Sequence, residues 1–299
     1  MIYTLTLNPA LDYVLRIPAV KEGETNRAAT ADLHFGGKGI NVSLVLSELG
    51  VESTALGFTA GFTGDALAAY LTERSIRTDF IRLPEGLTRI NVKLKTETAG
   101  ETEINAAGPA IPQDCTEALL SKLDALTEGD TLVMAGSIPR SLPKDIYRQI
   151  SKRLDGRGIR LVVDAEGESL TAALPYRPYL VKPNRAELEG IAGHALTTDG
   201  ELQWAAAELQ EKGARNVLVS LGGDGALLLD ENGICHRKPA FPVTPVNTVG
   251  AGDSMVAGFL AGVDRGYAYA LELGLACGGA TAASEGLADY TAILALCHP

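Results

Sequence analysis

Short apolar runs alternate with segments of helical periodicity along most of the chain. Runs such as IRLVVDA and VLVSL are apolar without alternation, which is typical of strands buried on both faces of a parallel sheet. Between them, apolar residues recur at the spacing of one helix face, as in Val42, Val45, Leu46 and Leu49. The pattern predicts strands at 3–7, 54–58, 131–134, 160–163, 179–181 and 217–221, and helices after Gly39, near residue 63, and at about 144–154, 185–192, 202–212 and 254–263.

The repeated order of strand and helix predicts a single α/β domain over residues 1–299. Successive parallel strands need crossover connections, and helices that connect them cover both faces of the sheet. We therefore expect a doubly wound, mostly parallel sheet.

Two segments, 12–35 and 88–108, break this order by alternating apolar and polar residues between turn signals. Ile90, Val92, Leu94 and Thr96 predict one strand of a hairpin, with Gly100 near the turn and a return strand at 103–107. Half-exposed strands of this kind predict a small sheet outside the main one. We expect it to act as a lid that excludes water from a reacting site, with hairpins of no function as the alternative.

Charge and composition limit the partners. The chain has 299 residues, 46% of them hydrophobic, and a formal net charge of -11, which excludes nucleic acid and an anionic membrane surface as partners. No apolar run is long enough to predict a membrane span, and the first residues lack the features of a secretory signal. The four cysteines form no C-x-x-C pair, so neither zinc nor disulfides are expected. We expect a cytoplasmic protein, and any phosphate site must concentrate local positive charge.

The first glycine-rich motif is FGGKGIN at residues 35–41, just before a predicted helix. Backbone amides at a helix N-terminus bind anions, and Lys38 adds a positive charge there. The motif is not a P-loop, because Gly39 stands where Ser or Thr is needed, and Val42 excludes the dinucleotide fingerprint. The alternative is a tight turn with an exposed lysine.

The second motif is NTVGAGD at residues 247–253, before an apolar helix. Gly250 and Gly252 allow close approach of a ligand to the backbone, and the amides at this helix start face developing negative charge. Asp253 is suited to take a proton from a hydroxyl beside a bound phosphate. Its alternative role is capping of the helix.

Two further motifs follow predicted strands. SLGGDG at residues 220–225 predicts either a loop against nucleotide phosphates or a turn between strands. KPNRAE at residues 182–187 leaves the carboxyl end of a strand, where open α/β sheets bind ligands. Asn184 and Glu187 also have the spacing of a capping box, which is the structural alternative.

Together these motifs resemble those of the ribokinase-like (PfkB-type) sugar kinases over nearly the whole chain. GGKGIN and NTVGAGDSMVAGF match the two family signatures, and KPNRAE and SLGGDG match the nucleotide-site motifs between them. The segments TLNPALDY at 6–13, TRINVKL at 88–94, ETEINAAGP at 101–109 and AGSIPRSLP at 135–143 are similar to the branch that phosphorylates fructose 1-phosphate. The branch that phosphorylates tagatose 6-phosphate shares TLNP-x-x-D, GGKG and GAGD, so it stays an alternative.

The resemblance implies ATP-dependent phosphorylation of the C6 hydroxyl of fructose 1-phosphate, with Mg²⁺ present and a homodimer formed through the lid sheets. It implies that Asp253 is the general base, that the backbone amides of Gly250, Ala251 and Gly252 stabilise the transferred phosphoryl group, and that Glu187 holds Mg²⁺ through water. The residues implied for the sugar phosphate are Asp12, Gly36, Gly37, Asn41, Lys38, Arg89 and Arg27, and those implied for ATP are Lys182, Asn184, Ser220, Gly222, Gly225 and Gly252.

Asn247 departs from the wider family, which often carries Asp in this cation-linked loop, so no potassium dependence is predicted.

Two rival functions come from other classes. A sugar-phosphate-binding regulator without catalysis does not need Asp253, which is present. A nicotinamide oxidoreductase needs a complete G-x-G-x-x-G after the first strand, which is absent.

Overall fold

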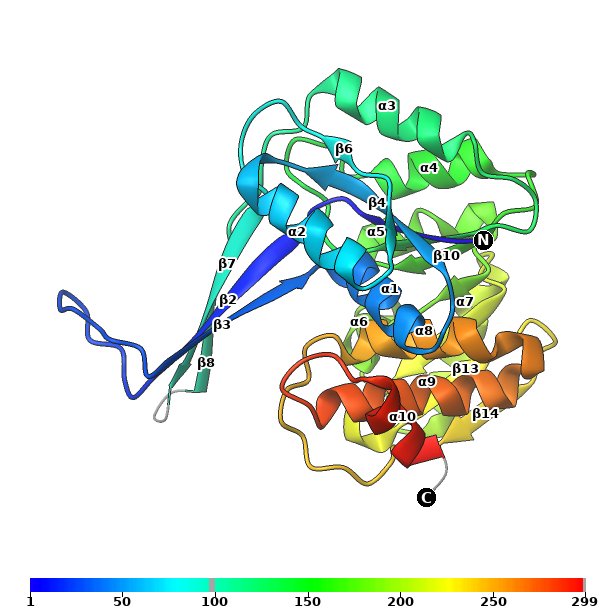
Figure 1. Cartoon of the computed structure of the whole chain (residues 1–299). Helices are drawn as coiled ribbons and strands as arrows, with labels where there is room; N and C mark the ends of the chain where they lie inside the picture. The colour runs from blue at the N-terminus through cyan, green and yellow to red at the C-terminus, as the bar shows by residue number, and fades with distance from the viewer. Residues whose placement is uncertain (97–99, 298–299) are drawn as a thin grey trace.

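A ten-stranded sheet forms the centre of the computed structural model, which describes residues 1–96 and 100–297 (Figure 1). Its strands are β1 (Ile2–Thr6), β4 (Ser53–Thr59), β5 (Arg77–Thr78), β6 (Ile81–Arg82), β9 (Thr131–Ala135), β10 (Arg160–Asp164), β11 (Leu180–Val181), β12 (Asn216–Ser220), β13 (Ala226–Leu229) and β14 (Cys235–Lys238). Their order is β14-β13-β12-β11-β10-β9-β1-β4-β5, with β6 beside β4. All neighbours are parallel except β12–β13 and β13–β14.

Helices cover both faces of this sheet. They are α1 (Lys38–Glu48), α2 (Gly61–Glu73), α3 (Gln113–Leu123), α4 (Ile146–Leu154), α5 (Gly167–Thr171), α6 (Arg185–Ala192), α7 (Asp199–Glu211), α8 (Ala251–Gly262), α9 (Tyr267–Ala282) and α10 (Tyr290–Cys297). Leu132 and Val163 pack in the core with α3–α7, whereas their neighbours Val133 and Val162 pack with α1 and α8–α10. Alternate residues of one strand thus enter opposite cores, which explains the uninterrupted apolar runs.

The predicted doubly wound, mostly parallel fold is confirmed, with small shifts at element ends. The helix expected at about 202–212 begins at Asp199, because Thr198 accepts a hydrogen bond from the Glu201 amide and closes a capping box. The helix expected at 254–263 begins already at Ala251, so the GAGD segment is its first turn. Helices α3, α5, α9 and α10 were not predicted.

A second sheet of four strands projects from the main body, at the left of Figure 1. Its strands are β2 (Ala10–Ile17), β3 (Thr30–Gly36), β7 (Arg89–Thr96) and β8 (Gly100–Ile104), in the order β3-β2-β7-β8. The return strand predicted at 103–107 begins earlier, because Gly100 pairs with Thr96, and the expected turn between them lies outside the described residues. The two segments that broke the sequence pattern therefore join in one sheet, since β2 and β7 pair in parallel.

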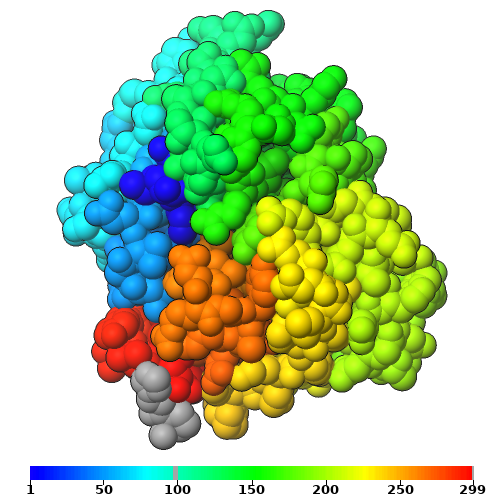
Figure 2. Space-filling view, turned by 90° about the vertical axis from the view of Figure 1, so that its right-hand side faces the viewer, coloured from blue at the N-terminus to red at the C-terminus, as the bar shows by residue number. Residues whose placement is uncertain are grey.

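The side of the molecule turned away from the small sheet is formed by segments from the middle and the later part of the chain (Figure 2). Figure 2 shows segments from the middle of the chain, in green, directly beside helix α9, in orange.

Within the described part of the chain, the structure contains no helix with the length and apolar character needed to span a bilayer.

Candidate active site

The GGKG turn joins the small sheet to α1 at the carboxyl end of β1. Gly37 has a φ of 127°, and a Cβ there would lie 2.7 Å from Thr6 Cγ2, so glycine is needed both for conformation and for space. The hydroxyl of Thr6 accepts a hydrogen bond from the Ile40 amide at 3.0 Å. This packing fixes the first turn of α1 and directs Lys38 and Asn41 into one cavity.

The first turn of α8 faces the same cavity. Gly250 has a φ of 81° and precedes the helix, and a Cβ on Gly252 would lie 3.1 Å from Lys182 Nζ. Asp253 is 5% exposed, and its Oδ2 accepts a hydrogen bond from Asn41 Nδ2 at 2.8 Å. The helix N-terminus, an ammonium group and a carboxylate thus lie together, as phosphate binding and proton removal require.

A buried carboxylate at the end of β10 holds two lysines. Asp164 Oδ1 lies 3.2 Å from Lys38 Nζ and 3.4 Å from Lys182 Nζ, and the Asp164 side chain is 1% exposed. Its Oδ2 has no hydrogen-bond partner within the described residues. The pairing lets the buried Lys182 and the partly exposed Lys38 share one carboxylate, where mutual repulsion would otherwise separate them.

The charges in this cavity shift the pKa values of its central groups. Burial raises the pKa of Asp253 to about 7, aided by the negative charge of Asp164 and opposed by the Asn41 amide and by Lys38 and Lys182. Burial alone would lower the pKa of Lys38, but the charges of Asp164 and Asp253 outweigh it, so this pKa lies above its ordinary value. Asp253 therefore changes protonation near neutral pH, while Lys38 stays charged.

The inner face of the small sheet supplies polar groups from the other side. Asp12 Oδ1 accepts a hydrogen bond from Asn91 Nδ2 at 2.8 Å, and Asp12 Oδ2 lies 3.5 Å from Lys93 Nζ. Arg89 Nε donates to the backbone oxygen of Asn8 at 3.3 Å. A fixed carboxylate and a guanidinium beside each other suit a ligand that carries both hydroxyl and phosphate groups.

The motifs after β11 and β12 also contribute residues to the cavity wall. Asn184 Oδ1 accepts from the Glu187 amide at 2.8 Å and Glu187 Oε2 accepts from the Asn184 amide at 2.9 Å, so the predicted capping box is confirmed. Ser220 ends β12 and forms a bridge to Asn184. A Cβ on Gly225 would lie 2.1 Å from the Lys238 backbone oxygen, so this glycine allows close packing of the hairpin.

Most of the predicted site residues line one cavity of about 680 Å³. The predicted residues that line it are Asp12, Gly37, Lys38, Asn41, Arg89, Lys182, Asn184, Glu187, Ser220, Gly250, Gly252 and Asp253. Gly36, Arg27, Ala251, Gly222 and Gly225 are not among the described residues that line it. Arg27 is exposed in the loop between β2 and β3, which extends from the small sheet in Figure 1.

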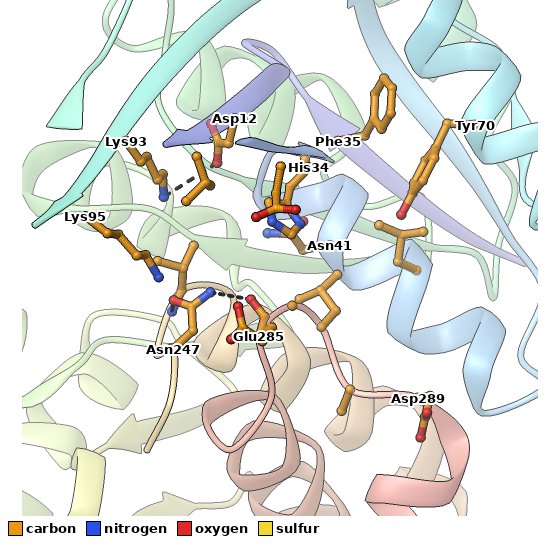
Figure 3. Close-up of a pocket in the computed structure, with 18 of the residues that line it drawn as sticks. Asp12, His34, Phe35, Asn41, Tyr70, Lys93, Lys95, Asn247, Glu285 and Asp289 are labelled. Atoms are coloured by element: carbon orange, nitrogen blue, oxygen red, sulfur yellow. Dashed lines mark hydrogen bonds and ion pairs between the residues drawn. The ribbon is translucent and has the colours of Figure 1, made fainter. Parts of the chain in front are cut away.

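A neighbouring cavity of about 320 Å³ lies between the small sheet and the loops beside α8 and α9 (Figure 3). It shares Asp12, Asn41, Lys93 and Val249 with the larger cavity, and Gly36 lines it. Asn247 Nδ2 donates to the Glu285 backbone oxygen at 2.9 Å. An aspartate could not donate this bond, which gives Asn247 a structural reason to depart from the family pattern.

Several polar residues of the larger cavity were not predicted from the sequence. They include Asn8, Asn91, Lys93, Asn105 and Ser137 as lining residues, and Asp164 as the partner of both lysines. Asp164 had a usable signal, because it directly follows the apolar run LVV at the carboxyl end of a predicted parallel strand. Asn91 and Lys93 lie on the polar face of a strand whose orientation the sequence did not reveal.

No group of three or more His, Cys, Asp or Glu side chains in residues 1–96 and 100–297 is arranged to hold a metal ion. Glu187 lines the cavity, but one of its oxygens already caps α6. A divalent ion here would therefore need water and ligand oxygens for most of its coordination.

Comparison with known proteins agrees with this geometry. The model of the pfkB family carbohydrate kinases matches residues 3–292. A 1-phosphofructokinase of Bacillus subtilis (strain 168) is 44% identical over 290 residues, which cover 96% of this chain and 94% of the relative. A D-tagatose-1-phosphate kinase of Bacillus licheniformis is 36% identical over 294 residues, which cover 97% of this chain and 95% of the relative.

Among solved structures, phosphofructokinase-2 from Escherichia coli in complex with substrates and products has a TM-score of 0.92 and 31% identity, covering 99% of this chain and 97% of that one. Fold and site together define a kinase of the expected ribokinase-like class. The chain belongs to the pfkB family of carbohydrate kinases.

Proposed function

We propose that the chain phosphorylates the C6 hydroxyl of fructose 1-phosphate with ATP, giving fructose 1,6-bisphosphate and ADP. The observation that carries this proposal is the buried Asp253 at the start of α8, in one cavity with cations and a second carboxylate, Asp12. The relatives named 1-phosphofructokinase support the choice of sugar phosphate. Asp253 takes the proton from the attacking hydroxyl, and the amides of Gly250, Ala251 and Gly252 stabilise the transferred phosphoryl group.

The proposed substrate side is formed by the small sheet and the start of α1. Asp12 accepts hydrogen bonds from sugar hydroxyls, and Gly37 and Asn41 complete this part of the cavity. Gly36 lines the neighbouring cavity instead. Arg89 and Lys38 bind the phosphate that the sugar already carries, whereas Arg27 is exposed in the loop between β2 and β3 and has no role here. The small sheet acts as a lid, which an ion pair between Arg16 and Glu285 connects to the main body.

The proposed nucleotide side is formed by Lys182, Asn184 and Ser220, with Gly252 allowing close approach of the phosphates. Gly222 and Gly225 lie in the turn after Ser220, where Gly225 serves the packing of the hairpin. Glu187 would hold Mg²⁺ through water, in keeping with its position on the cavity wall. When bound, Mg²⁺ neutralises charge on the nucleotide phosphates. Lys182 adds positive charge on this side, and its partner Asp164 also pairs with Lys38 of the substrate side.

A coupled assay of ADP release tests the proposed function. The panel is fructose 1-phosphate, tagatose 1-phosphate, tagatose 6-phosphate, fructose 6-phosphate and fructose. We expect the highest kcat/KM with fructose 1-phosphate, and a much lower value with fructose, because Arg89 and Lys38 would then face no phosphate. Binding of sugar phosphate without ADP release would instead indicate a regulator without catalysis.

Tagatose 1-phosphate kinase is the second candidate, because a relative of that name is 36% identical over nearly the whole chain. Tagatose and fructose differ only at C4, and their 1-phosphates present the same phosphate to Arg89. Comparable turnover on both, or a preference for tagatose 1-phosphate or tagatose 6-phosphate, would overturn the substrate proposed above.

We propose that two copies pair through the outer faces of their small sheets. On this face Tyr13 pairs with Leu33, and Val92 pairs with Ile104. Tyr13 is 38% exposed, Leu33 47%, Ile90 39% and Ile104 58%. Exposed apolar side chains gathered on one face of a sheet favour a partner with the same surface.

Leu33→Glu is expected to convert the proposed dimer to a monomer, because a charge would be buried in the centre of an apolar interface. Light scattering after size-exclusion chromatography measures the mass. Ile234→Glu is the matched control, since Ile234 is 55% exposed in a turn of the main body. A monomeric wild type, or a dimer that persists in Leu33→Glu, would contradict this interface.

We also propose a cytoplasmic location. The reaction consumes ATP, and all four cysteines are free in the structure, in keeping with a reducing compartment. The net charge of -11 supports the absence of nucleic-acid and membrane partners.

A further inference from the structure

Lys93 is a buried cation for which the proposed reaction has no role so far. Its side chain is only 8% exposed, on β7, one of the two inner strands of the small sheet. It belongs to the segment TRINVKL at 88–94, which supported the family resemblance but gave Lys93 no role of its own. The side chain points from β7 toward Asp12 and lines both the substrate cavity and its neighbour (Figure 3).

The ammonium group of Lys93 lies between two carboxylates on neighbouring strands. Its Nζ is 3.5 Å from Asp12 Oδ2 on β2 and 3.4 Å from Glu103 Oε1 on β8. A hydrogen bond from Asn105 lowers the pKa of Glu103, with a further contribution from Lys93, so Glu103 is ionised at neutral pH. Lys93 therefore sits in a charged row that crosses three strands.

The other oxygen of Asp12 is held from the same strand. Asn91 Nδ2 donates to Asp12 Oδ1 at 2.8 Å, and Asn91 Oδ1 accepts from the Ala106 amide at 3.2 Å, which orients the amide. Asp12 is thus held by an amide on one oxygen and faces an ammonium group on the other. A carboxylate held in this way keeps its remaining lone pairs in fixed directions.

Burying an ammonium group costs free energy that its ion pairs must offset. The opposite face of this sheet is apolar, so the fold itself does not require a charge at this strand. The ammonium group of Lys93 instead lies beside Asp12, the carboxylate to which the proposed function assigns the sugar hydroxyls. A fixed carboxylate favours hydroxyls in one arrangement and disfavours an epimer in which one of them is inverted.

We infer that Lys93 is a positioning residue that, through Asp12, sets the selectivity of the site among ketohexose 1-phosphates. The inference rests on the proposed function. Lys93 orients Asp12 Oδ2 while Asn91 orients Oδ1. Without the ammonium group, Asp12 can turn about its side-chain bonds and accept hydroxyls in either epimeric arrangement.

Lys93→Met tests this role, because methionine keeps the length of the side chain and removes the charge. We expect the KM for fructose 1-phosphate to rise about 10-fold, with a smaller change in kcat, as for loss of one charged hydrogen bond. The ratio of kcat/KM between fructose 1-phosphate and tagatose 1-phosphate should fall several-fold. The Kd of fructose 1-phosphate, measured by calorimetry without ATP, should rise in parallel with the KM.

Lys95→Met is the matched control. Lys95 lies two residues further along the same face of β7, and its Nζ is 3.8 Å from Glu101 Oε2. It lines the neighbouring cavity but is not among the described residues of the substrate cavity. Its removal should leave the KM and the epimer ratio within about twofold of wild type. An equal effect of both variants would show a general loss of charge or of sheet structure, and would overturn the role given to Lys93.

A double-mutant cycle with Asp12→Asn separates positioning from direct contact. If Lys93 acts through Asp12, Lys93→Met adds little to the loss in Asp12→Asn. Additive losses would overturn the inference and indicate that Lys93 contacts the substrate itself. If Lys93→Met does not fold, Lys93→Gln is measured instead, and a wild-type epimer ratio in that variant likewise overturns it. A wild type that neither binds nor phosphorylates fructose 1-phosphate contradicts the proposed function instead.

Discussion

Asp253→Asn is expected to lower kcat by about 10²- to 10⁴-fold, the range for loss of a general base. The amide keeps the size of the carboxylate but cannot accept a proton from the attacking hydroxyl. Binding should be largely retained, because the amides of the α8 N-terminus and the ion pairs of Lys38 and Lys182 with Asp164 remain. The measurements are kcat in the ADP-release assay and the Kd of fructose 1-phosphate by calorimetry.

The pH dependence gives this prediction a second readout. Burial and the charge of Asp164 raise the pKa of Asp253 to about 7. Only the ionised carboxylate accepts a proton, so kcat should rise about tenfold per pH unit below pH 7 and level off above it. This acid limb should disappear in Asp253→Asn.

Asp264→Asn is the matched control for Asp253→Asn. Asp264 is exposed just beyond the other end of α8, so its removal should change neither kcat nor the pH profile. A kcat within a few-fold of wild type in Asp253→Asn, or an acid limb that persists there, would exclude Asp253 as the base.

Features that depend on local chain geometry could be predicted from the sequence. The GGKG and GAGD turns need glycine for conformation and close packing, and each is followed by an apolar helix, so their positions at helix starts were foreseeable. The apolar runs likewise predicted β9, β10 and β12, because burial on both faces removes alternation. Asn184 and Glu187 formed the predicted capping box, since its geometry is set by four consecutive residues.

Features that depend on how strands are placed in space could not be predicted. The alternation in β7 predicted a half-exposed strand, but it did not show which half is exposed. The structure exposes the apolar Ile90, at 39%, and buries the polar Asn91 and Lys93, at 6% and 7%. The polar face is buried because it borders the cavity. From the sequence alone, Lys93 looks like a polar residue on the solvent-exposed face of a strand, so it was not recognised as a site residue.

Asp164 shows the same limit in the main sheet. Its neighbours in space, Lys38 and Lys182, lie on other segments of the chain. Lys182 meets it because β11 is adjacent to β10, and Lys38 meets it because β1, where α1 begins, is separated from β10 only by β9. The sequence offered the carboxylate after an apolar run, but not the partners that give it a role. The order of the strands in the sheet brings these residues together, and the local sequence pattern does not determine that order.

Asp164→Asn is expected to destabilise the fold by about 3–5 kcal/mol, the usual cost of breaking a buried ion pair. The amide leaves the ammonium group of Lys182, whose side chain is 6% exposed, without its carboxylate partner. The free energy of unfolding, from urea denaturation at neutral pH, measures this loss. Asp124→Asn is the control, because its pair with Arg153 is exposed on both sides and should contribute no more than about 1 kcal/mol.

The same substitution should move the acid limb of kcat to lower pH. The negative charge of Asp164 raises the pKa of Asp253, while Lys38 and Lys182 lower it. Removing Asp164 leaves only the lowering charges, so Asp253 ionises in more acidic solution and its limb follows. We therefore expect Asp164→Asn to be less stable and yet to keep its activity to lower pH. A loss of packing alone would lower the stability without shifting the pH dependence of kcat. An unmoved limb would show that Asp164 and Asp253 do not interact in the working enzyme, and unchanged stability would show that the two lysines find other partners.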